Sequence, residues 1–353
     1  MNISYDFVPM GYVATPEQGK VYVDVGNAFC PGVLDHHHPD ASDACTAELV
    51  MNHPECVLSQ FVDGYLTIIP HEYPDLDAVT GAYFAKMHTN GYPVEKMHHQ
   101  WAKYVRRVDQ GFTTLDVEQS VSPYSLFMMR MRSVQEEMQG GDIHSVSMRM
   151  LEAGIELLDI FFTWFKKGGS LQNSDELANM EMFAPEIASI LNDLKKYQQD
   201  ILRADIFNCT VLKKEGSGSE EVMGLWLENP ESLMFKSWAR GDVKSSGKEQ
   251  GFVFLGVQIS EHRFILSVDP SSGTCLKGLG DKLEQAEVKK RKLLGLERTG
   301  EKRPGYDSPD PWYDGRSPLH SYTVIDSPKV GTVLNSDEVK ITLKGYLCMG
   351  ERS

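Results

Sequence analysis

Runs of hydrophobic residues predict two strands in the first quarter of the chain. Residues 20–25 and 65–69 are rich in β-branched and aromatic side chains, and Pro70 stops the second run. Each run leads into a polar loop and then into a predicted helix, over 42–51 and 77–87. In the second of these helices, residues three and four positions apart lie on one face. A strand, a polar loop and a helix, repeated in this order, predict an α/β domain with a parallel sheet.

Helical periodicity dominates the middle of the chain. Further helices are predicted over 93–108, 123–139, 143–167 and 174–203. The large hydrophobic residues of 143–167 repeat on one face, which is more typical of core packing than of a cofactor site. For the earlier helix over 42–51, we expect Asp40 or Ser42 as the N-cap.

Short strands replace the long helices after about residue 204. They are predicted over 206–212, 222–227, 251–258, 262–268 and 322–325. A charged helix is predicted over 281–294. The complete pattern predicts three parts, which are an α/β domain over 1–119, a helical block over 120–203 and a smaller α+β domain over 204–353.

Composition and charge restrict the classes of function. The chain has 353 residues, of which 41% are hydrophobic, and a formal net charge of −15. This charge argues against a protein that holds long nucleic acid through its overall field, but it is compatible with a small anionic substrate. The N-terminus lacks a signal-peptide pattern and no apolar stretch is long enough to span a bilayer. Six scattered cysteines without a CxxC pair favour reduced thiols and a cytoplasmic location.

Two clusters of carboxylates and imidazoles follow the first two predicted strands. Asp24 ends the first strand and is followed by Asp35-His36-His37-His38, and the second strand leads into His71-Glu72-Tyr73-Pro74-Asp75-Leu76-Asp77. Ligands in open α/β sheets collect outside the carboxyl ends of the strands, where both clusters are expected. Two hard divalent ions need a bridging carboxylate and several terminal ligands. The combined clusters therefore predict a two-metal site.

Each of these residues also has a simpler interpretation. Asp75 alone is more typical of an N-cap than of a metal ligand, because Asp at a helix start accepts free N–H groups. His71 alone, or the histidine triplet alone, could be surface imidazoles. Cys30 and Cys45 lie near the triplet, but packed small residues are the simpler explanation. It is the combination of the clusters that favours a metal site.

The clusters resemble the motifs of the DHH phosphoesterase superfamily. The shared residues are Asp35-His36-His37 and His71-x-x-Pro74-Asp75-x-Asp77-Ala78. Asp24-Val25-Gly26 shortly before the triplet is similar to the melanocyte-proliferating-gene-like branch, and Tyr104 to Gly111 resembles its later Asp motif. The resemblance covers about residues 20–111. The order of the two main motifs is the reverse of that in most of the superfamily, as in a circular permutation.

The resemblance implies a role for each residue of the clusters. His71 and Asp75 would bind one metal ion, and Asp77 and His36 the other. Asp24 would bridge the two ions, and Asp109 would complete the second site. His37 would face the scissile phosphate, while Asp35 would orient the histidines without binding a metal ion itself. His38 has no counterpart in the motif. The implied cofactors are two Mn²⁺ or Mg²⁺ ions, and the oxygen-rich ligand set favours manganese over zinc.

The C-terminal part contains weaker candidates for substrate contacts. The superfamily resemblance implies that a second domain supplies such contacts, and Arg240 and Arg316 could clamp a phosphate in a bidentate way. Gly278-Leu279-Gly280 could offer backbone N–H groups to an anion, although a simple turn is the more common use. Trp312 and Tyr313 could stack on a base or fill a small core.

The sequence therefore predicts a metal-dependent phosphohydrolase. Its expected substrate is a phosphodiester or phosphoanhydride, such as a short oligonucleotide or a nucleotide-derived anion, and the chain could act as a homodimer. One alternative is a metal-binding regulatory or scaffold protein without catalysis. Another is a nuclease whose C-terminal region binds single-stranded nucleic acid through the basic run over 282–303, although a solvated helix face with interleaved glutamates is the simpler interpretation.

Overall fold

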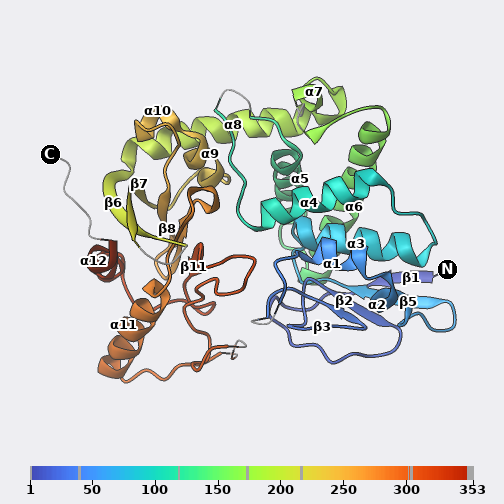
Figure 1. Ribbon diagram of the computed structural model, residues 1–353, viewed down its shortest axis with the longest axis horizontal. Helices are drawn as coiled ribbons and strands as arrows, with labels where there is room; N and C mark the ends of the chain where they lie inside the picture. Colours follow the sequence, from blue (N-terminus) through green and yellow to red (C-terminus); the bar gives the residue numbers. More distant parts are fainter. Residues whose placement is uncertain are drawn as a thin grey trace. The chain divides into compact units, whose positions relative to one another are not determined.

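The computed structural model describes residues 2–38, 41–117, 120–171, 175–214, 218–300, 302 and 305–347. Within this part, the chain is an α/β protein with two mixed sheets and surrounding helices (Figure 1). The α/β class predicted from the sequence is therefore confirmed. In the same part of the chain, no helix combines the length and apolar character needed to cross a membrane.

The chain divides into two compact units. The first comprises Met1–Gln110 and Val121–Ile190, and the second comprises Gly111–Ser120 and Leu191–Ser353. Most of the predicted helical block therefore belongs with the N-terminal sheet. The three functional parts predicted from the sequence, with boundaries after residues 119 and 203, stay a prediction.

A five-stranded sheet forms the base of the first unit, in the order β1-β5-β2-β4-β3. Its strands are β1 (Asn2–Tyr5), β2 (Lys20–Val23), β3 (Phe29–Cys30), β4 (Val33–Leu34) and β5 (Tyr65–Ile69). The strands predicted over 20–25 and 65–69 are thus present as β2 and β5. β1, β5, β2 and β4 run parallel.

The edge strand β3 departs from the predicted parallel sheet. β3 runs antiparallel to β4, and both lie inside a segment that was predicted to be a loop. Only Pro31 and Gly32 connect them, and Gly32 has a φ of +86°. A Pro-Gly pair favours a tight turn, and strands joined by two residues can pair only in the antiparallel direction. The sheet is therefore mixed.

Helices of the first unit stack over one face of this sheet (Figure 1). They are α1 (Thr46–Asn52), α2 (Pro54–Leu58), α3 (Leu76–Thr89), α4 (Lys96–Asp109), α5 (Pro123–Glu137), α6 (Ile143–Lys166) and α7 (Asp175–Ala178). α3 contacts β2 and β5 directly, and α1, α4 and α6 all contact α3. The hydrophobic face predicted for residues 143–167 is buried, with Leu151, Leu157 and Phe161 fully enclosed.

The helix predicted over 174–203 is interrupted. A 3₁₀ turn (Glu181–Phe183) separates α7 from α8 (Ala184–Asp200), and a second 3₁₀ turn (Ile201–Arg203) follows. Pro185 accounts for the break, because proline lacks the N–H group that a continuous helix would use at this position. It is tolerated in the first turn of α8, where this N–H group has no helical partner.

The helix predicted over 42–51 begins later than expected. α1 starts at Thr46 with Cys45 at its N-cap position, and the Ser42 hydroxyl accepts a hydrogen bond from Ala44 N instead. Asp40, the other predicted cap, lies outside the described residues. The first amides of α1 are bound by a carboxylate from elsewhere in the fold, which is described below.

A six-stranded mixed sheet forms the second unit, in the order β10-β6-β7-β8-β9-β11. Its strands are β6 (Asp205–Lys213), β7 (Ser219–Glu228), β8 (Phe254–Ser260), β9 (Arg263–Val268), β10 (Thr274–Cys275) and β11 (Val324–Asp326). β7 and β8 pair in parallel, and the other neighbours pair antiparallel. All five strands predicted in this region are present.

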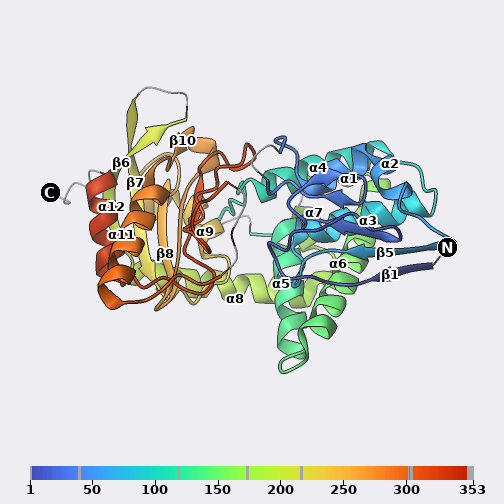
Figure 2. The ribbon, with the colours of Figure 1, turned by 90° about the horizontal axis from the view of Figure 1, so that it is seen from below.

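Helices also complete the second unit. They are α9 (Phe235–Gly241), α10 (Val243–Ser246), the 3₁₀ turn Pro270–Ser272, α11 (Leu279–Leu294) and α12 (Ser336–Leu347). α11 and α12 lie together beside the sheet (Figure 2), and their buried leucines and Val339 share one core with the strands. α11 confirms the predicted helix over 281–294, whereas α9 and α12 were not predicted.

Candidate metal centre

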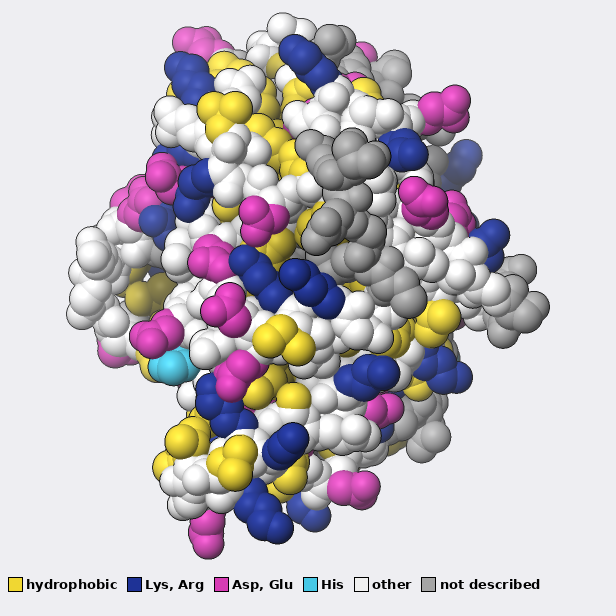
Figure 3. All heavy atoms as spheres, turned by 90° about the vertical axis from the view of Figure 1, so that its left-hand side faces the viewer, with side chains coloured by type: hydrophobic (Ala, Val, Ile, Leu, Met, Phe, Trp, Pro, Cys, Tyr) yellow, Lys and Arg dark blue, Asp and Glu magenta, His cyan; other side chains and the backbone are white. Residues whose placement is uncertain are grey.

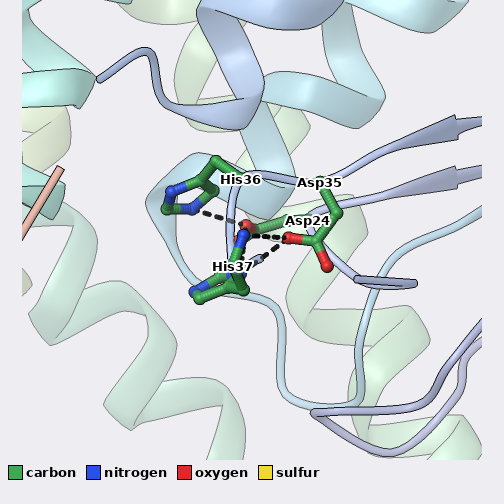
Figure 4. Close-up of side chains that lie close together, drawn as sticks. All are labelled: Asp24, Asp35, His36 and His37. Carbon is green, nitrogen blue, oxygen red and sulfur yellow. Dashed lines mark hydrogen bonds and ion pairs between the residues drawn. The ribbon is translucent and has the colours of Figure 1, made fainter. Parts of the chain in front are cut away.

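The carboxyl ends of three parallel strands bring the predicted clusters together. β2 lies between β4 and β5 in the sheet, so the residues that follow these strands meet at one edge. Asp24 follows β2 directly, Asp35 follows β4, and His71 follows β5 after one proline. Figure 4 shows Asp24, Asp35, His36 and His37 gathered around one point.

Asp24 has an unusual backbone conformation. Its φ is +59°, in the left-handed region that non-glycine residues seldom occupy. Gly26 follows at φ +122°, and a Cβ there would lie 2.5 Å from Val33 Cγ1, so only glycine fits. This turn ends β2 and directs the Asp24 carboxylate to His36, whose Nε2 lies 3.2 Å from Asp24 Oδ1. Strained backbone of this kind concentrates at functional sites.

The first ligand group consists of Asp24, His71 and Asp75. His71 Nε2 lies 3.5 Å from Asp24 Oδ2 and 3.9 Å from Asp75 Oδ1. Because His71 Nδ1 lies 2.8 Å from the carbonyl oxygen of Glu72, its proton is expected on Nδ1, which leaves the Nε2 lone pair for a cation. One ligand atom from each of the three residues lies within 4.8 Å of the others.

Asp75 is both a helix N-cap and a candidate metal ligand, as the two interpretations of the sequence proposed. Its Oδ1 accepts hydrogen bonds from Asp77 N and Ala78 N, so it is the N-cap of α3. The same side chain belongs to the first ligand group. The N-cap interpretation is therefore confirmed, and it fixes the carboxylate in the position from which it could bind a cation.

The second ligand group consists of His36, Asp77 and Asp109. His36 Nε2 lies 3.6 Å from Asp77 Oδ2 and 3.5 Å from Asp109 Oδ2. Ligand atoms of the three residues again lie within 4.8 Å of one another. Asp109 is the last residue of α4, so it reaches the cluster from a segment that lies outside both main motifs.

The Asp77 carboxylate also binds the start of α1. Thr46 N donates to Asp77 Oδ2 and Ala47 N donates to Asp77 Oδ1, both at 2.8 Å. Asp77 thus satisfies two helix amides that the local sequence leaves without a side-chain cap. Neither Thr46 nor its contact with the site was predicted, because the pairing depends on the packing of α1 against α3.

His37 and Asp35 form a hydrogen-bonded pair beside the ligand groups. His37 Nδ1 lies 2.7 Å from Asp35 Oδ1, and the same oxygen accepts from His37 N at 3.0 Å (Figure 4). Asn27 N holds the other carboxylate oxygen at 2.6 Å. The His37 side chain is 38% exposed, whereas Asp35 is buried. The four residues in Figure 4 also lie close enough together to be an alternative ligand group.

Electrostatics of the cluster favour a bound cation. Burial would raise the pKa of Asp24, but hydrogen bonds from His36 and His71 hold it well below its usual range. Burial and the charge of Asp24 raise the pKa of Asp77 well above its usual value, and raise that of Asp109 to about 6. Without a cation, these carboxylates repel each other in a site with little solvent.

The pKa values of the two imidazoles beside these carboxylates are also raised, but by the neighbouring charges and against the effect of burial. Burial would lower the pKa of His36, but the surrounding carboxylates raise it well above its ordinary value. Burial and the neighbouring His36 would lower the pKa of His37, but Asp35 and Asp24 raise it further, so it lies above its ordinary value. A divalent cation would replace the protons that this cluster otherwise attracts.

The donor set fits a hard divalent cation. Within the described residues, Asp109 Oδ2 is buried and accepts no hydrogen bond. Oxygen atoms from Asp24, Asp75, Asp77 and Asp109 dominate the two groups, with one imidazole in each. The structure thus brings together all six residues that were predicted as ligands, and their binding of metal stays a prediction. His38 is not part of any ligand group among the described residues.

Arg240 and Arg316 are engaged within the second unit. Arg240 is buried, and its guanidinium donates to the carbonyl oxygens of Phe252 and Val253 and to the Ser267 hydroxyl at 3.0 Å. Arg316 pairs with Asp314 through Nε at 2.8 Å and lies over the Tyr306 ring. These contacts give both residues structural roles, and their role as phosphate clamps stays a prediction.

The other candidates of the C-terminal part also have structural roles. Trp312 is buried in the core of the second unit, so the packing interpretation is confirmed for it. Gly280 lies against Asp314, where a Cβ would approach to 2.6 Å, and Gly278 starts α11 in a left-handed turn. The cysteines at 30, 45, 56, 209 and 275 are free thiols, as expected, and Cys348 lies outside the described residues.

Three cations of the basic run over 282–303 form ion pairs with acidic neighbours. Lys290 pairs with Glu338, Arg291 with Glu287, and Arg298 with Glu284. On the face shown in Figure 3, Lys and Arg side chains are interspersed with Asp and Glu, although a few Lys and Arg side chains lie next to each other near the centre. Arg303 lies outside the described residues. These contacts favour the solvated-helix interpretation over a nucleic-acid surface.

Comparison with known proteins adds no family assignment. No protein-family model, curated protein or solved structure matches the chain.

Proposed function

We propose that the chain is a phosphohydrolase that uses two divalent metal ions. The observation that carries this proposal is the convergence of Asp24, His36, His71, Asp75, Asp77 and Asp109. These residues come from three strand ends and two helices that are far apart in the sequence. An accidental acidic surface patch would be exposed, whereas Asp24, His36, His71 and Asp77 are almost fully buried.

His71 and Asp75 would hold one ion, and His36, Asp77 and Asp109 the other, with Asp24 shared between them. The close approach of Asp24 oxygens to both His36 and His71 supports this sharing. Manganese or magnesium ions would act as Lewis acids on the phosphoryl group and would generate a nucleophile from water. The oxygen-rich donor set favours Mn²⁺ and Mg²⁺ over zinc.

His37 would act on the substrate. Asp35 accepts from His37 Nδ1 and therefore fixes the ring, while the partly exposed Nε2 side faces away from this pair. Because the pKa of His37 lies above its ordinary value, the ring would carry a proton over a wider range of pH. A protonated His37 would stabilise charge on a phosphoryl oxygen or give its proton to the leaving oxygen.

The proposed substrate is a phosphodiester or phosphoanhydride of small size. The net charge of −15 argues against a long polyanion, and two cations of α11, Lys290 and Arg291, are already paired with glutamates. A short oligonucleotide or a nucleotide-derived anion fits these constraints. Arg240 or Arg316 as a phosphate clamp, a cytoplasmic location and a homodimeric state complete the proposal.

Metal analysis of the purified chain, followed by assays with Mn²⁺, tests the proposal. Dinucleotides, short oligonucleotides and pyrophosphate serve as substrates. Asp24→Asn and Asp77→Asn should abolish Mn²⁺-dependent turnover while circular dichroism shows an unchanged fold. Asp63→Asn is the matched control, because Asp63 is exposed and has a φ of +51° that asparagine tolerates. Full activity in both site variants would refute the proposal.

Stoichiometric metal without turnover on these substrates would favour the alternative of a regulatory or scaffold protein. Salt-sensitive binding of single-stranded nucleic acid, lost on joint replacement of Lys290, Arg291 and Lys292 by Glu, would favour the nuclease alternative. We expect no such binding, because Lys290 and Arg291 already pair with glutamates.

A further inference from the structure

Thr46 makes two contacts with the carboxylates of the candidate metal centre. It is the first residue of α1, and no part of it is exposed. Its hydroxyl donates to Asp24 Oδ1 at 3.1 Å, and its backbone N–H donates to Asp77 Oδ2 at 2.8 Å. One residue therefore holds both the Asp24 carboxylate, which belongs to the first ligand group, and the Asp77 carboxylate, which belongs to the second.

The hydroxyl differs from the other groups that face Asp24. His36 and His71 approach the same carboxylate through Nε2, at 3.2 and 3.5 Å. A ring nitrogen that coordinates a cation through its lone pair cannot donate a hydrogen bond at the same time. With ions bound, Thr46 Oγ1 would remain a donor to Asp24, while His36 and His71 would have become ligands.

Packing fixes the direction of this hydroxyl. A Cβ built on Gly81 of α3 would lie 3.1 Å from Thr46 Cγ2, so the methyl group lies close against the helix backbone at Gly81. Because a β-branched side chain has few χ1 rotamers, placing the methyl group also places the hydroxyl. The hydroxyl is thus held towards Asp24 before any cation binds.

We propose that Thr46 is a positioning residue of the metal centre, whose hydroxyl fixes the Asp24 carboxylate in the orientation that two cations can share. This inference rests on the proposed metal-dependent function. Hydrogen-bond partners of metal ligands contribute to affinity, and their loss commonly weakens metal binding about 10- to 100-fold. Loss of the Thr46 hydroxyl should therefore weaken Mn²⁺ binding at least about tenfold.

The test compares Thr46→Val, which keeps the shape but removes the donor, with Thr46→Ser, which keeps the donor. Mn²⁺ affinity is measured by calorimetry, the environment of bound Mn²⁺ by electron paramagnetic resonance, and the fold by circular dichroism. Thr89→Val is the matched control, because Thr89 is also a buried threonine of the first unit and its hydroxyl donates to Ala85 O. Thr46→Ala replaces the valine variant if the latter does not fold.

The expected result is at least about tenfold weaker Mn²⁺ binding and an altered resonance spectrum for Thr46→Val. Thr89→Val should bind like the wild type. Thr46→Ser should bind Mn²⁺ clearly more tightly than Thr46→Val, but somewhat less tightly than the wild type because serine lacks the methyl group that fixes the hydroxyl. This recovery by serine separates positioning from general loss of stability. Equal Mn²⁺ affinity of the wild type and Thr46→Val would overturn the inference while leaving the proposed function intact. A wild-type chain that binds no Mn²⁺ would overturn both.

Discussion

In the absence of divalent cations, the free energy of unfolding of the chain should fall as the pH rises. In the metal-free chain, burial would lower the pKa of His71, but the hydrogen bond with Asp24 and the charge of Asp75 raise it to about 9. Burial and the charge of Asp24 raise the pKa of Asp109 to about 6. Both residues therefore bind a proton more tightly in the folded state than in the unfolded state.

The direction of the pH effect follows from these raised values. The contribution of Asp109 is complete below its unfolded pKa of 3.8 and is lost as the pH rises through about 6. The contribution of His71 is complete below 6.5 and is lost as the pH rises through about 9. Since one pKa unit corresponds to about 1.4 kcal/mol, each group loses on the order of 3 kcal/mol across its window.

The size of the measured stability loss depends on how exposed Asp109 and His71 are to solvent and on their shared interaction with Asp24. The side chains of Asp109 and His71 are 17% and 1% exposed, so solvent screens them little. Both interact with Asp24, so their contributions are not independent, and we expect a total loss of at least about 3 kcal/mol between pH 4 and 9. Bound Mn²⁺ should remove the loss, because the cation takes the place of the protons.

Urea denaturation at pH 5, 7 and 9, with a chelator or with saturating Mn²⁺, measures the effect. General charge repulsion also grows with pH, so the slope for the wild type is compared with that for His71→Gln. His144→Gln is the control, because His144 is an exposed histidine of the same unit. The reasoning would be refuted by a chelated wild type whose stability does not fall with pH, or falls no more steeply than that of His71→Gln.

Three further substitutions test packing and backbone conformation within the two units. Gly154→Ala should lower the free energy of unfolding by about 1–3 kcal/mol, because its Cβ would lie 2.7 Å from Val79 Cγ1 between α6 and α3, and a lower urea midpoint would show this. Tyr73→Asn should raise the melting temperature. Tyr73 has a φ of +52°, and asparagine adopts this left-handed conformation at a free-energy cost lower than that of tyrosine by about 1 kcal/mol. Arg240→Met should destabilise the chain by about 2–4 kcal/mol, because it removes a donor from three buried acceptors, of which the Val253 carbonyl oxygen keeps its hydrogen bond from Asp269 N. A raised KM for a phosphate substrate with unchanged stability would instead indicate a phosphate clamp at Arg240.

Local patterns were sufficient for much of the fold. β2 and β5 were predictable because β-branched residues cluster in short runs, and α6 because its hydrophobic residues repeat at the helical period. The β3–β4 hairpin was missed because each strand has only two residues, too few to show an alternating pattern. The break before α8 was missed although Pro185 signals it, because the hydrophobic period continues on both sides of the proline.

For the second unit, the sequence predicted the strands but not the hydrogen-bond partners of its arginine side chains. Arginine matches the oxygens of a phosphate, which makes Arg240 and Arg316 candidates, yet a sequence does not reveal whether a guanidinium already has hydrogen-bond partners. Arg240 donates to backbone carbonyl oxygens next to β8, and Arg316 pairs with Asp314. Such contacts depend on how the chain packs, and no spacing or composition signals them.

By itself, the sequence determined the chemistry of the candidate site and its place at the carboxyl ends of β2 and β5, whereas β4, which precedes Asp35, emerged only in the structure. Oxygen and imidazole ligands stand directly after apolar runs, and parallel strands bring their ends to one edge. Only the tertiary structure decided how these ligands are held. Asp77 binds the first amides of α1, and Thr46 directs a hydroxyl at Asp24. Both contacts join residues more than 20 positions apart, and they arise because α1 packs against α3.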